Sequence, residues 1–175
     1  VVRCSDSPNF IANRVGVAGM LATMIEVKNF GLGYDVVDDL TGKKMGRASS
    51  GTYRTADVVG LDTMTHVIKT LQNGCADDPF AASFAIPADV AALLEKGNFG
   101  QKTKAGFYKK EGKNVLQFDV KTGEYVPAGA KADKEVADIL RKAPAERLKA
   151  LRESSNPQAQ FIWAMLRNAF HYAAV

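Results

Sequence analysis

The chain has 175 residues, which allows one ordinary domain, or one domain with part of another, and excludes a large multidomain protein. With 46% apolar and 24% charged residues it is too apolar for intrinsic disorder, so we expect a sizeable core. The formal net charge of +4 is too small to indicate nucleic-acid binding.

The first predicted element is a long, mostly buried helix over residues 9–29. Apolar residues recur there mostly every three to five positions, which is the spacing of one helix face. Ser7 or Asn9 is expected to cap its start, because both side chains can accept a hydrogen bond from a free backbone N–H. Gly31 and Gly33 are expected to end it, since glycine tolerates left-handed backbone conformations.

Three further segments follow before the middle of the chain. A short helix is predicted at 35–40, with Asp35 as its cap. Residues 42–51 are rich in glycine, serine and lysine, which favours a mobile loop and makes this segment a candidate lid. Residues 52–71 regain helical spacing and predict one helix, bent at its weak point, Gly60.

The second half of the chain is predicted to form one small sheet with helices before and after it. Residues 88–96 predict a helix, and residues 105–126 alternate short β-prone runs with glycine turns, as in a small antiparallel meander. Helices are predicted at 133–142, 144–153 and 156–175. No βαβ alternation occurs, so the chain is expected to be mainly helical and unable to form a nucleotide-binding sheet. The last helix carries an apolar stripe of Phe161, Ile162, Met165, Leu166 and Ala169.

Few residues show a spacing typical of catalysis. Neither His66 nor His171 has a carboxylate or serine at the spacing of a general base, which favours packed or surface roles. The acidic pairs at 38–39 and 77–78 are adjacent, so we expect caps and solvated charges. The two cysteines lack any metal-like spacing, so we expect free thiols and no metal site.

Asn13 and a group of lysines are the more informative polar residues. Asn13 sits inside an apolar helix, where it is either a satisfied structural amide or a residue that faces a cleft. Lys102 and Lys104 belong to a basic cluster that continues to Lys113. This cluster is either a solvated face or a contact to a phosphate-bearing ligand.

Three runs together, Ser7–Arg14, Val58–Thr63 and Gly100–Tyr108, resemble the C-terminal helical domain of the 3-hydroxyacyl-CoA dehydrogenase family. The remainder resembles the segment leading to a second, degenerate copy of this domain in fused, multifunctional fatty-acid β-oxidation enzymes. The resemblance therefore implies an all-α fold with a small antiparallel β-meander. It places the first domain at 5–127, and linker helices with the truncated start of a second copy at 128–175.

The resemblance also implies an activity, the NAD-dependent oxidation of 3-hydroxyacyl-CoA to 3-ketoacyl-CoA. NAD and the catalytic histidine–glutamate pair would lie on a Rossmann domain N-terminal to this one, so the chain alone is expected to be inactive. Asn13 matches the family asparagine that contacts the substrate or the catalytic histidine. Lys102 and Lys104 are candidate substrate contacts, and no cofactor-binding or metal-binding residue is expected here.

The expected partners are the acyl-CoA substrate, the Rossmann domain of the same polypeptide and a second copy in a homodimer, in the cytoplasm. No apolar run approaches the roughly 18 residues of a membrane span, so no span is expected.

The absence of an initial methionine and the uncapped helical end predict a piece of a longer chain. Two departures from the family are Asn9, where glycine is usual, and the longer segment 45–55. The alternative function is a non-catalytic helical interaction module that docks a partner on the stripe of the last helix.

Overall fold

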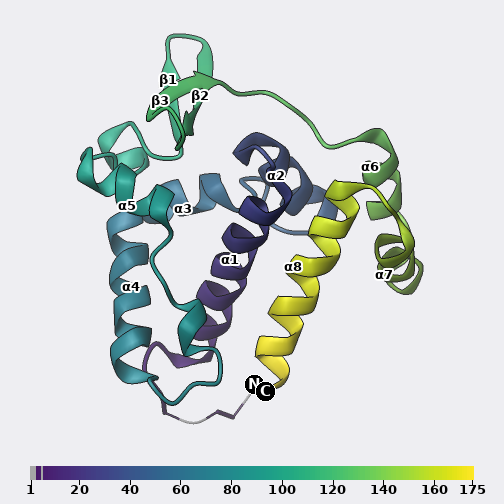
Figure 1. Ribbon diagram of the computed structural model, residues 1–175, viewed down its shortest axis with the longest axis horizontal. Coiled ribbons are helices and arrows are strands. Elements are labelled where there is room, and N and C mark those ends of the chain that lie inside the picture. The colour runs from purple at the N-terminus through teal and green to yellow at the C-terminus, as the bar shows by residue number, and fades with distance from the viewer. Residues whose placement is uncertain (1–2, 5) are drawn as a thin grey trace.

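The computed structural model describes residues 3, 4 and 6–175, and the expected mainly helical fold with a small antiparallel sheet is confirmed (Figure 1). The predicted start of the first domain, residue 5, lies outside the described residues. The α-helices are α1 (Phe10–Phe30), α2 (Tyr34–Thr41), α3 (Tyr53–Val59), α4 (Leu61–Gly74), α5 (Ala88–Glu95), α6 (Lys134–Leu140), α7 (Pro144–Glu153) and α8 (Pro157–Ala174). Short 3-10 helices are η1 (Lys43–Met45), η2 (Ala81–Ser83) and η3 (Gln101–Thr103), and the strands are β1 (Tyr108–Glu111), β2 (Asn114–Asp119) and β3 (Glu124–Pro127).

Helix α1 forms the centre of the molecule and ends as its sequence predicts. Gly31 takes a left-handed φ of 63°, and its N–H bonds the carbonyl of Val27. At the start, Asn9 also has a left-handed φ, of 65°, but its side chain forms no cap. Its amide instead donates to the carbonyl of Val67 in α4, at 3.0 Å. The capping role expected for Asn9 is therefore wrong, because a tertiary contact takes its side chain.

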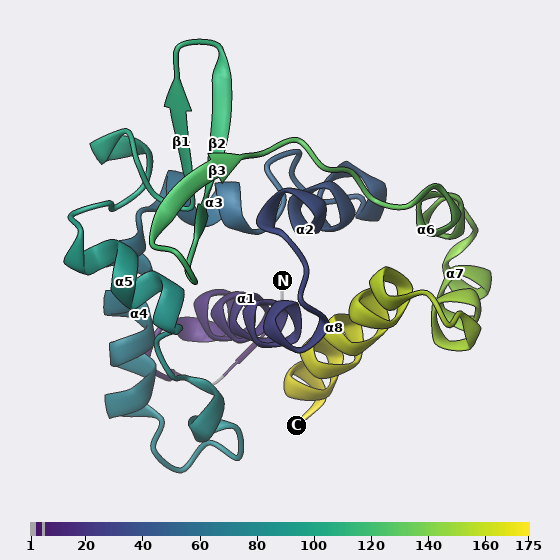
Figure 2. The same cartoon turned by 45° about the horizontal axis from the view of Figure 1, so that its top comes forward.

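The same helix is, by length and composition, long and apolar enough to cross a membrane, although no span was expected. A core helix of a soluble protein also satisfies that test. Met24 and Val27 of α1 are buried, and α8 packs along the helix (Figures 1 and 2). One side of α1 thus belongs to the hydrophobic core, and 33% of the apolar window that passes the test is buried.

The single helix expected over 52–71 is broken into α3 and α4. Gly60 separates them with φ 96° and ψ 128°, a conformation outside the helical region that L-residues with side chains rarely adopt. The N–H of Leu61 then bonds the carbonyl of Phe99 at 3.0 Å. Gly60 therefore makes a corner, whereas the sequence indicated only a bend.

The segment expected as a mobile lid, 42–51, is tied to α2 in the structure. It contains η1, and it ends at Gly51, whose φ is 68° and whose missing side chain lets it lie against the backbone of Asp38. The Asp38 carboxylate accepts hydrogen bonds from three successive backbone N–H groups at the start of α3, those of Thr52, Tyr53 and Arg54. A buried acid of α2 thereby caps α3 across this segment.

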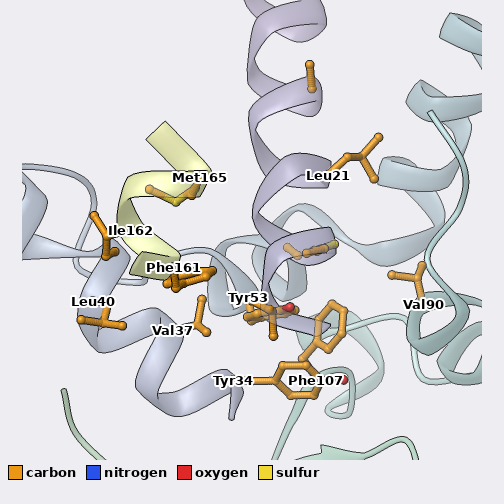
Figure 3. Close-up of a cluster of buried hydrophobic side chains, with 14 of the residues drawn as sticks. Leu21, Tyr34, Val37, Leu40, Tyr53, Val90, Phe107, Phe161, Ile162 and Met165 are labelled. Atoms are coloured by element: carbon orange, nitrogen blue, oxygen red, sulfur yellow. The ribbon is translucent and has the colours of Figure 1, made fainter. Parts of the chain in front are cut away.

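Aromatic side chains join the helices to the loop before the sheet. Tyr34 of α2, Tyr53 of α3 and Phe107 before β1 form a buried cluster, with ring centroids 4.3 to 5.0 Å apart (Figure 3). The sheet itself has the order β1-β2-β3, with both pairs antiparallel, which confirms the expected meander. Because the cluster lies at the base of the sheet, it fixes the meander against the helices.

Helix α8 returns to the centre of the fold and lies beside α1 (Figures 1 and 2). Asn156 caps its start by accepting the N–H of Gln158 at 2.9 Å. Phe161 and Ile162 are fully buried, and Figure 3 shows them near Val37 and Leu40 of α2. The two segments proposed as separate domains therefore share one hydrophobic core. The boundary at 127 stays a prediction.

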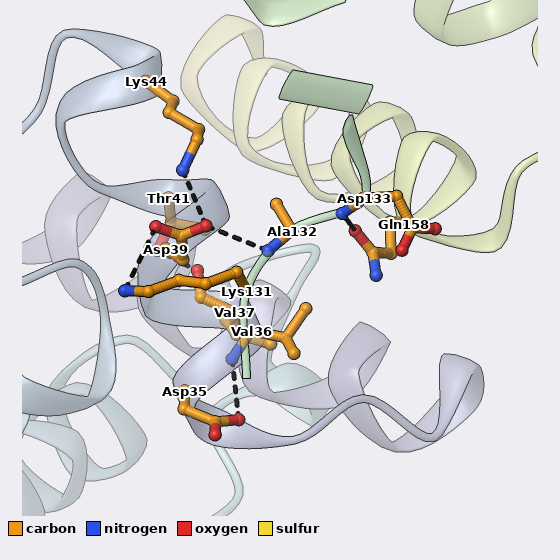
Figure 4. A network of polar contacts seen from close by, with 10 residues as sticks. All are labelled: Asp35, Val36, Val37, Asp39, Thr41, Lys44, Lys131, Ala132, Asp133 and Gln158. Atoms are coloured by element: carbon orange, nitrogen blue, oxygen red, sulfur yellow. Dashed lines mark hydrogen bonds and ion pairs between the residues drawn. The ribbon is translucent and has the colours of Figure 1, made fainter. Parts of the chain in front are cut away.

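The segment 128–133 crosses from the sheet to α6 and is held by two carboxylates of α2 (Figure 4). Asp35 accepts hydrogen bonds from two successive backbone N–H groups of this segment, both at 2.8 Å. Asp39 accepts the N–H of Ala132 at 2.9 Å and forms an ion pair with Lys44 at 2.6 Å. Gly33, and not Asp35, occupies the N-cap position of α2, so the expected cap is instead an anchor for a distant segment.

Candidate functional site

Asn13 lies in the first turns of α1, half-buried, between exposed apolar residues. The side chains of Phe10 and Ile11 are 59% and 46% exposed. Among residues 3, 4 and 6–175, the Asn13 amide has no hydrogen-bond partner, although Asn9 one turn earlier is bonded to α4. The sequence left two roles open for Asn13, a satisfied structural amide or a residue that faces a cleft. The structural role is not observed, because the fold itself does not use this amide. Its donors and its acceptor are available to a group outside these residues.

The neighbouring Arg14 has a structural role that the sequence did not predict. Its guanidinium pairs with Asp78 at 2.6 Å, and the Tyr172 hydroxyl donates to the same carboxylate oxygen at 3.0 Å. Burial alone would raise the pKa of Asp78, but hydrogen bonds from the Phe80 N–H and from these two side chains hold it below its usual value. The acid expected to be a solvated charge is thus a junction that joins α1, the loop after α4 and α8.

The corner at Gly60 brings the family-like run Val58–Thr63 next to the run Gly100–Tyr108. Val58 and Val59 are 58% and 51% exposed at this corner. Lys102 of η3 forms an ion pair with Asp62, and its ammonium lies 5.7 Å from the ring centroid of Phe99. The first of the two predicted substrate lysines is therefore already paired with a carboxylate of its own chain.

Asp57 organises the loop that carries the second lysine. Its buried carboxylate accepts hydrogen bonds from the N–H groups of Phe107 and Tyr108, at 2.8 and 2.9 Å. A side chain at Gly106 would collide with this carboxylate, and one at Gly100 would collide with the Asp57 backbone. Burial raises the pKa of Asp57 to about 6, against the effect of the two N–H donors.

A basic pocket of about 610 Å³ opens above Asp57. Lys104 and Arg54 line it, and the Arg54 guanidinium carbon lies 4.7 Å from the ring centroid of Tyr108, a cation–π distance. Lys104 holds a left-handed φ of 60°, which is unfavourable for a residue with a side chain. Lys109 and Lys110 also line the pocket. The structure therefore separates Lys104, which lines a pocket, from Lys102, which is paired.

The pocket residues that were not predicted as site residues include Arg54, Asp57 and Tyr108. The run containing Gly106 and Tyr108 was recognised as a motif, but Asp57 is fifty positions away in the sequence. Periodicity within a helix carries no information on such a pairing. A rule that a buried acid needs donors could have marked Asp57, since charged groups are rarely buried unpaired.

The described residues do not form a binding site for NAD, the cofactor that the resemblance implies. The only sheet among them is the antiparallel meander, and no strand leads into a helix through a glycine-rich turn. The glycines at 31 and 33 follow α1, and the first turn of α2 carries Asp35, whose charge would repel a pyrophosphate. Any NAD would have to be held by other residues.

Comparison with known proteins gives one family. A family model described as the C-terminal domain of 3-hydroxyacyl-CoA dehydrogenase matches residues 10–110. A probable 3-hydroxyacyl-CoA dehydrogenase of Bacillus subtilis is 38% identical over 175 residues, covering 99% of this chain and 22% of the relative. A probable 3-hydroxyacyl-CoA dehydrogenase of Deinococcus radiodurans is 41% identical over 110 residues, covering 63% of this chain and 31% of the relative.

A mitochondrial hydroxyacyl-coenzyme A dehydrogenase of Sus scrofa is 29% identical over 109 residues, covering 62% of this chain and 33% of the relative. The chain thus spans only about a fifth to a third of the length of these relatives. The match to the Bacillus protein also takes in the segment after residue 127.

Proposed function

Because the chain belongs to the 3-hydroxyacyl-CoA dehydrogenase family and matches its C-terminal domain, we propose that it is the substrate-side part of an enzyme that oxidises 3-hydroxyacyl-CoA to 3-ketoacyl-CoA with NAD. In this proposal NAD and the residues that transfer the substrate proton lie on a Rossmann domain outside these residues. The present chain closes the cleft over the acyl-CoA, positions it and excludes water.

The observation that carries this proposal is the free amide of Asn13. A half-buried amide without an internal hydrogen bond can serve a partner that arrives from outside, either the substrate or a catalytic side chain. Phe10 and Ile11 beside it, and Val58 and Val59 at the α3–α4 corner, are exposed apolar side chains. Exposed apolar side chains beside an unused polar group, here Phe10 and Ile11, favour contact with another domain.

The test is Asn13→Ala in the longer enzyme that contains the Rossmann domain. We expect kcat/KM to fall roughly ten- to a hundredfold, the effect of losing one transition-state hydrogen bond of about 1.4 to 2.8 kcal/mol. We expect the melting temperature to stay nearly unchanged, because the fold does not use the amide. Asn73→Ala, an exposed asparagine at the end of α4, is the matched control and should leave both quantities unchanged. A large drop in melting temperature with normal kinetics would contradict the proposal.

The alternative function, docking of a partner on the apolar stripe of the last helix, loses its main support. Phe161, Ile162, Met165 and Leu166 are buried in the structure, so the stripe is already covered by the chain itself. The homodimer and the cytoplasmic location stay predictions of the family resemblance, and the acyl-CoA substrate and the Rossmann partner are parts of the proposal above.

A further inference from the structure

The first turns of α1, which carry the unused amide of Asn13, are held by contacts to other elements. Asn9 and Phe10 both have left-handed φ values, of 65° and 40°, which residues with side chains keep only where surrounding contacts enforce them. Asn9 donates to the carbonyl of Val67 in α4 at 3.0 Å. The start of this helix therefore depends on tertiary contacts for its position.

Asp78, in the loop after α4, supplies a second contact at this end of α1. Its side chain is only 3% exposed. It accepts hydrogen bonds from the Arg14 guanidinium at 2.6 Å, the Tyr172 hydroxyl at 3.0 Å and the Phe80 N–H at 2.8 Å. These donors come from α1, α8 and the loop itself, so the carboxylate is fixed from three sides. Hydrogen bonds between charged groups are shorter and stronger than neutral ones, and Arg14 is therefore held in one place by the fold.

The position of Asn13 follows from that of Arg14. The two residues are consecutive in one helical turn, whose backbone hydrogen bonds leave little freedom between them. The Asn13 amide itself has no hydrogen-bond partner within residues 3, 4 and 6–175. The backbone on either side of it, held by Asn9 and by Arg14, therefore sets where the amide lies.

We propose that Asp78 is a positioning residue for the reaction: through Arg14 it fixes the backbone that presents Asn13. The inference rests on the proposed function, in which Asn13 contacts the substrate or a catalytic side chain. Tyr172 extends the same control to α8, which lies beyond residues 10–110, the part of the chain that matches the family model. A segment outside the matched domain thereby contributes to the site.

The experiment is a double-mutant cycle in the longer enzyme that contains the Rossmann domain, with kcat and KM measured for Asp78→Asn, Asn13→Ala and the pair. Asp78→Asn removes the charge that holds Arg14 but keeps the shape of the side chain. We expect it alone to lower kcat/KM roughly tenfold, because a misplaced group loses its transition-state contact. In the Asn13→Ala background we expect a change of less than about twofold, since the group that Asp78 positions is then absent.

This non-additivity separates positioning from a loss of stability. If Asp78→Asn merely unfolded part of the enzyme, it would lower kcat/KM by the same factor in both backgrounds, and that result would overturn the proposal. Asp77→Asn, at the exposed neighbouring acid, is the matched control and should leave kcat and KM unchanged.

A milder variant covers the case in which Asp78→Asn does not fold. Tyr172→Phe removes a single hydrogen-bond donor from the Asp78 carboxylate and keeps the aromatic ring. We expect it to lower kcat/KM roughly threefold, the effect of one neutral donor, and to have no effect in the Asn13→Ala background. An equal loss in both backgrounds would again contradict positioning.

The outcomes distinguish this inference from the proposed function. Normal kinetics of Asn13→Ala would remove the proposed function, and the inference with it. A fall in kcat/KM for Asn13→Ala, together with normal kinetics of Asp78→Asn and Tyr172→Phe, would retain the function and overturn the positioning role alone.

Discussion

Buried carboxylates that bind backbone N–H groups determine the local geometry of this protein. Asp38 accepts three such groups at the start of α3, and Asp57 accepts two at the start of β1. Burial raises the pKa of both acids, because it removes the charged form from water. Each acid also needs a neighbouring glycine, Gly51 or Gly106, whose missing side chain leaves room for the contact.

The raised pKa of Asp57, about 6, predicts a pH dependence of stability. An aspartate in the unfolded chain has a pKa of about 3.9, so between these values the folded protein holds a proton that the unfolded chain releases. The contribution of Asp57 to the free energy of unfolding is therefore fully present below pH of about 4 and is lost as pH rises through about 6. At about 1.4 kcal/mol per pKa unit, its size is at most about 3 kcal/mol.

The measurement is denaturant unfolding of the wild type and Asp57→Asn from pH of about 4 to 7. The variant cannot titrate at this position, so the wild type should become less stable relative to it as pH rises. Asp77→Asn, at an exposed site of the same residue type, should show a constant difference from the wild type. A constant difference for Asp57→Asn as well would contradict the assignment.

At the scale of elements, packing decides where α8 lies. The sequence marks an apolar stripe on this helix that either a partner or the chain itself has to cover. The structure shows the second, with Phe161 and Leu166 0% and 7% exposed while Phe170 on the same helix is 58% exposed. Burying one large apolar side chain stabilises by roughly 1.5 to 3 kcal/mol, which favours the nearest available apolar surface.

Lysine substitutions on this helix test the packing. Phe161→Lys or Leu166→Lys should lower the free energy of unfolding by about 3 kcal/mol or more, because each places a charge in the core and removes a large apolar side chain from it. The same variants should lose helical circular dichroism from α8. Phe170→Lys, on the exposed face, should change stability by less than about 0.5 kcal/mol. If all three variants behave alike, α8 does not pack as described.

At the scale of the whole molecule, the chain has one core but incomplete chemistry. The buried apolar residues extend from α1 to α8 as a single cluster. The described residues nevertheless contain neither a dinucleotide-binding sheet nor a positioned acid–base pair. A stable fold therefore does not imply that this chain alone is an active enzyme.

We accordingly expect the 175-residue chain alone to oxidise no 3-hydroxyacyl-CoA. The measurement is NADH formation from 3-hydroxybutyryl-CoA and NAD, followed by absorbance, with the enzyme that includes the Rossmann domain as the positive control. Turnover that is proportional to the chain and survives repurification would show that these residues suffice.

The sequence by itself determined the helical class, the meander, the extents of α1 and α7, and the family, since hydrophobic spacing, glycine and proline positions and short motifs are local properties. It also marked Asn13 and Lys104 through motif and charge. Only the tertiary structure decided that Gly60 is a corner, that Lys102 is paired, and that Asp38 and Asp57 bind distant backbone. The physical reason is that a buried charge needs partners, and its partners are chosen by how the chain packs and not by their distance along it.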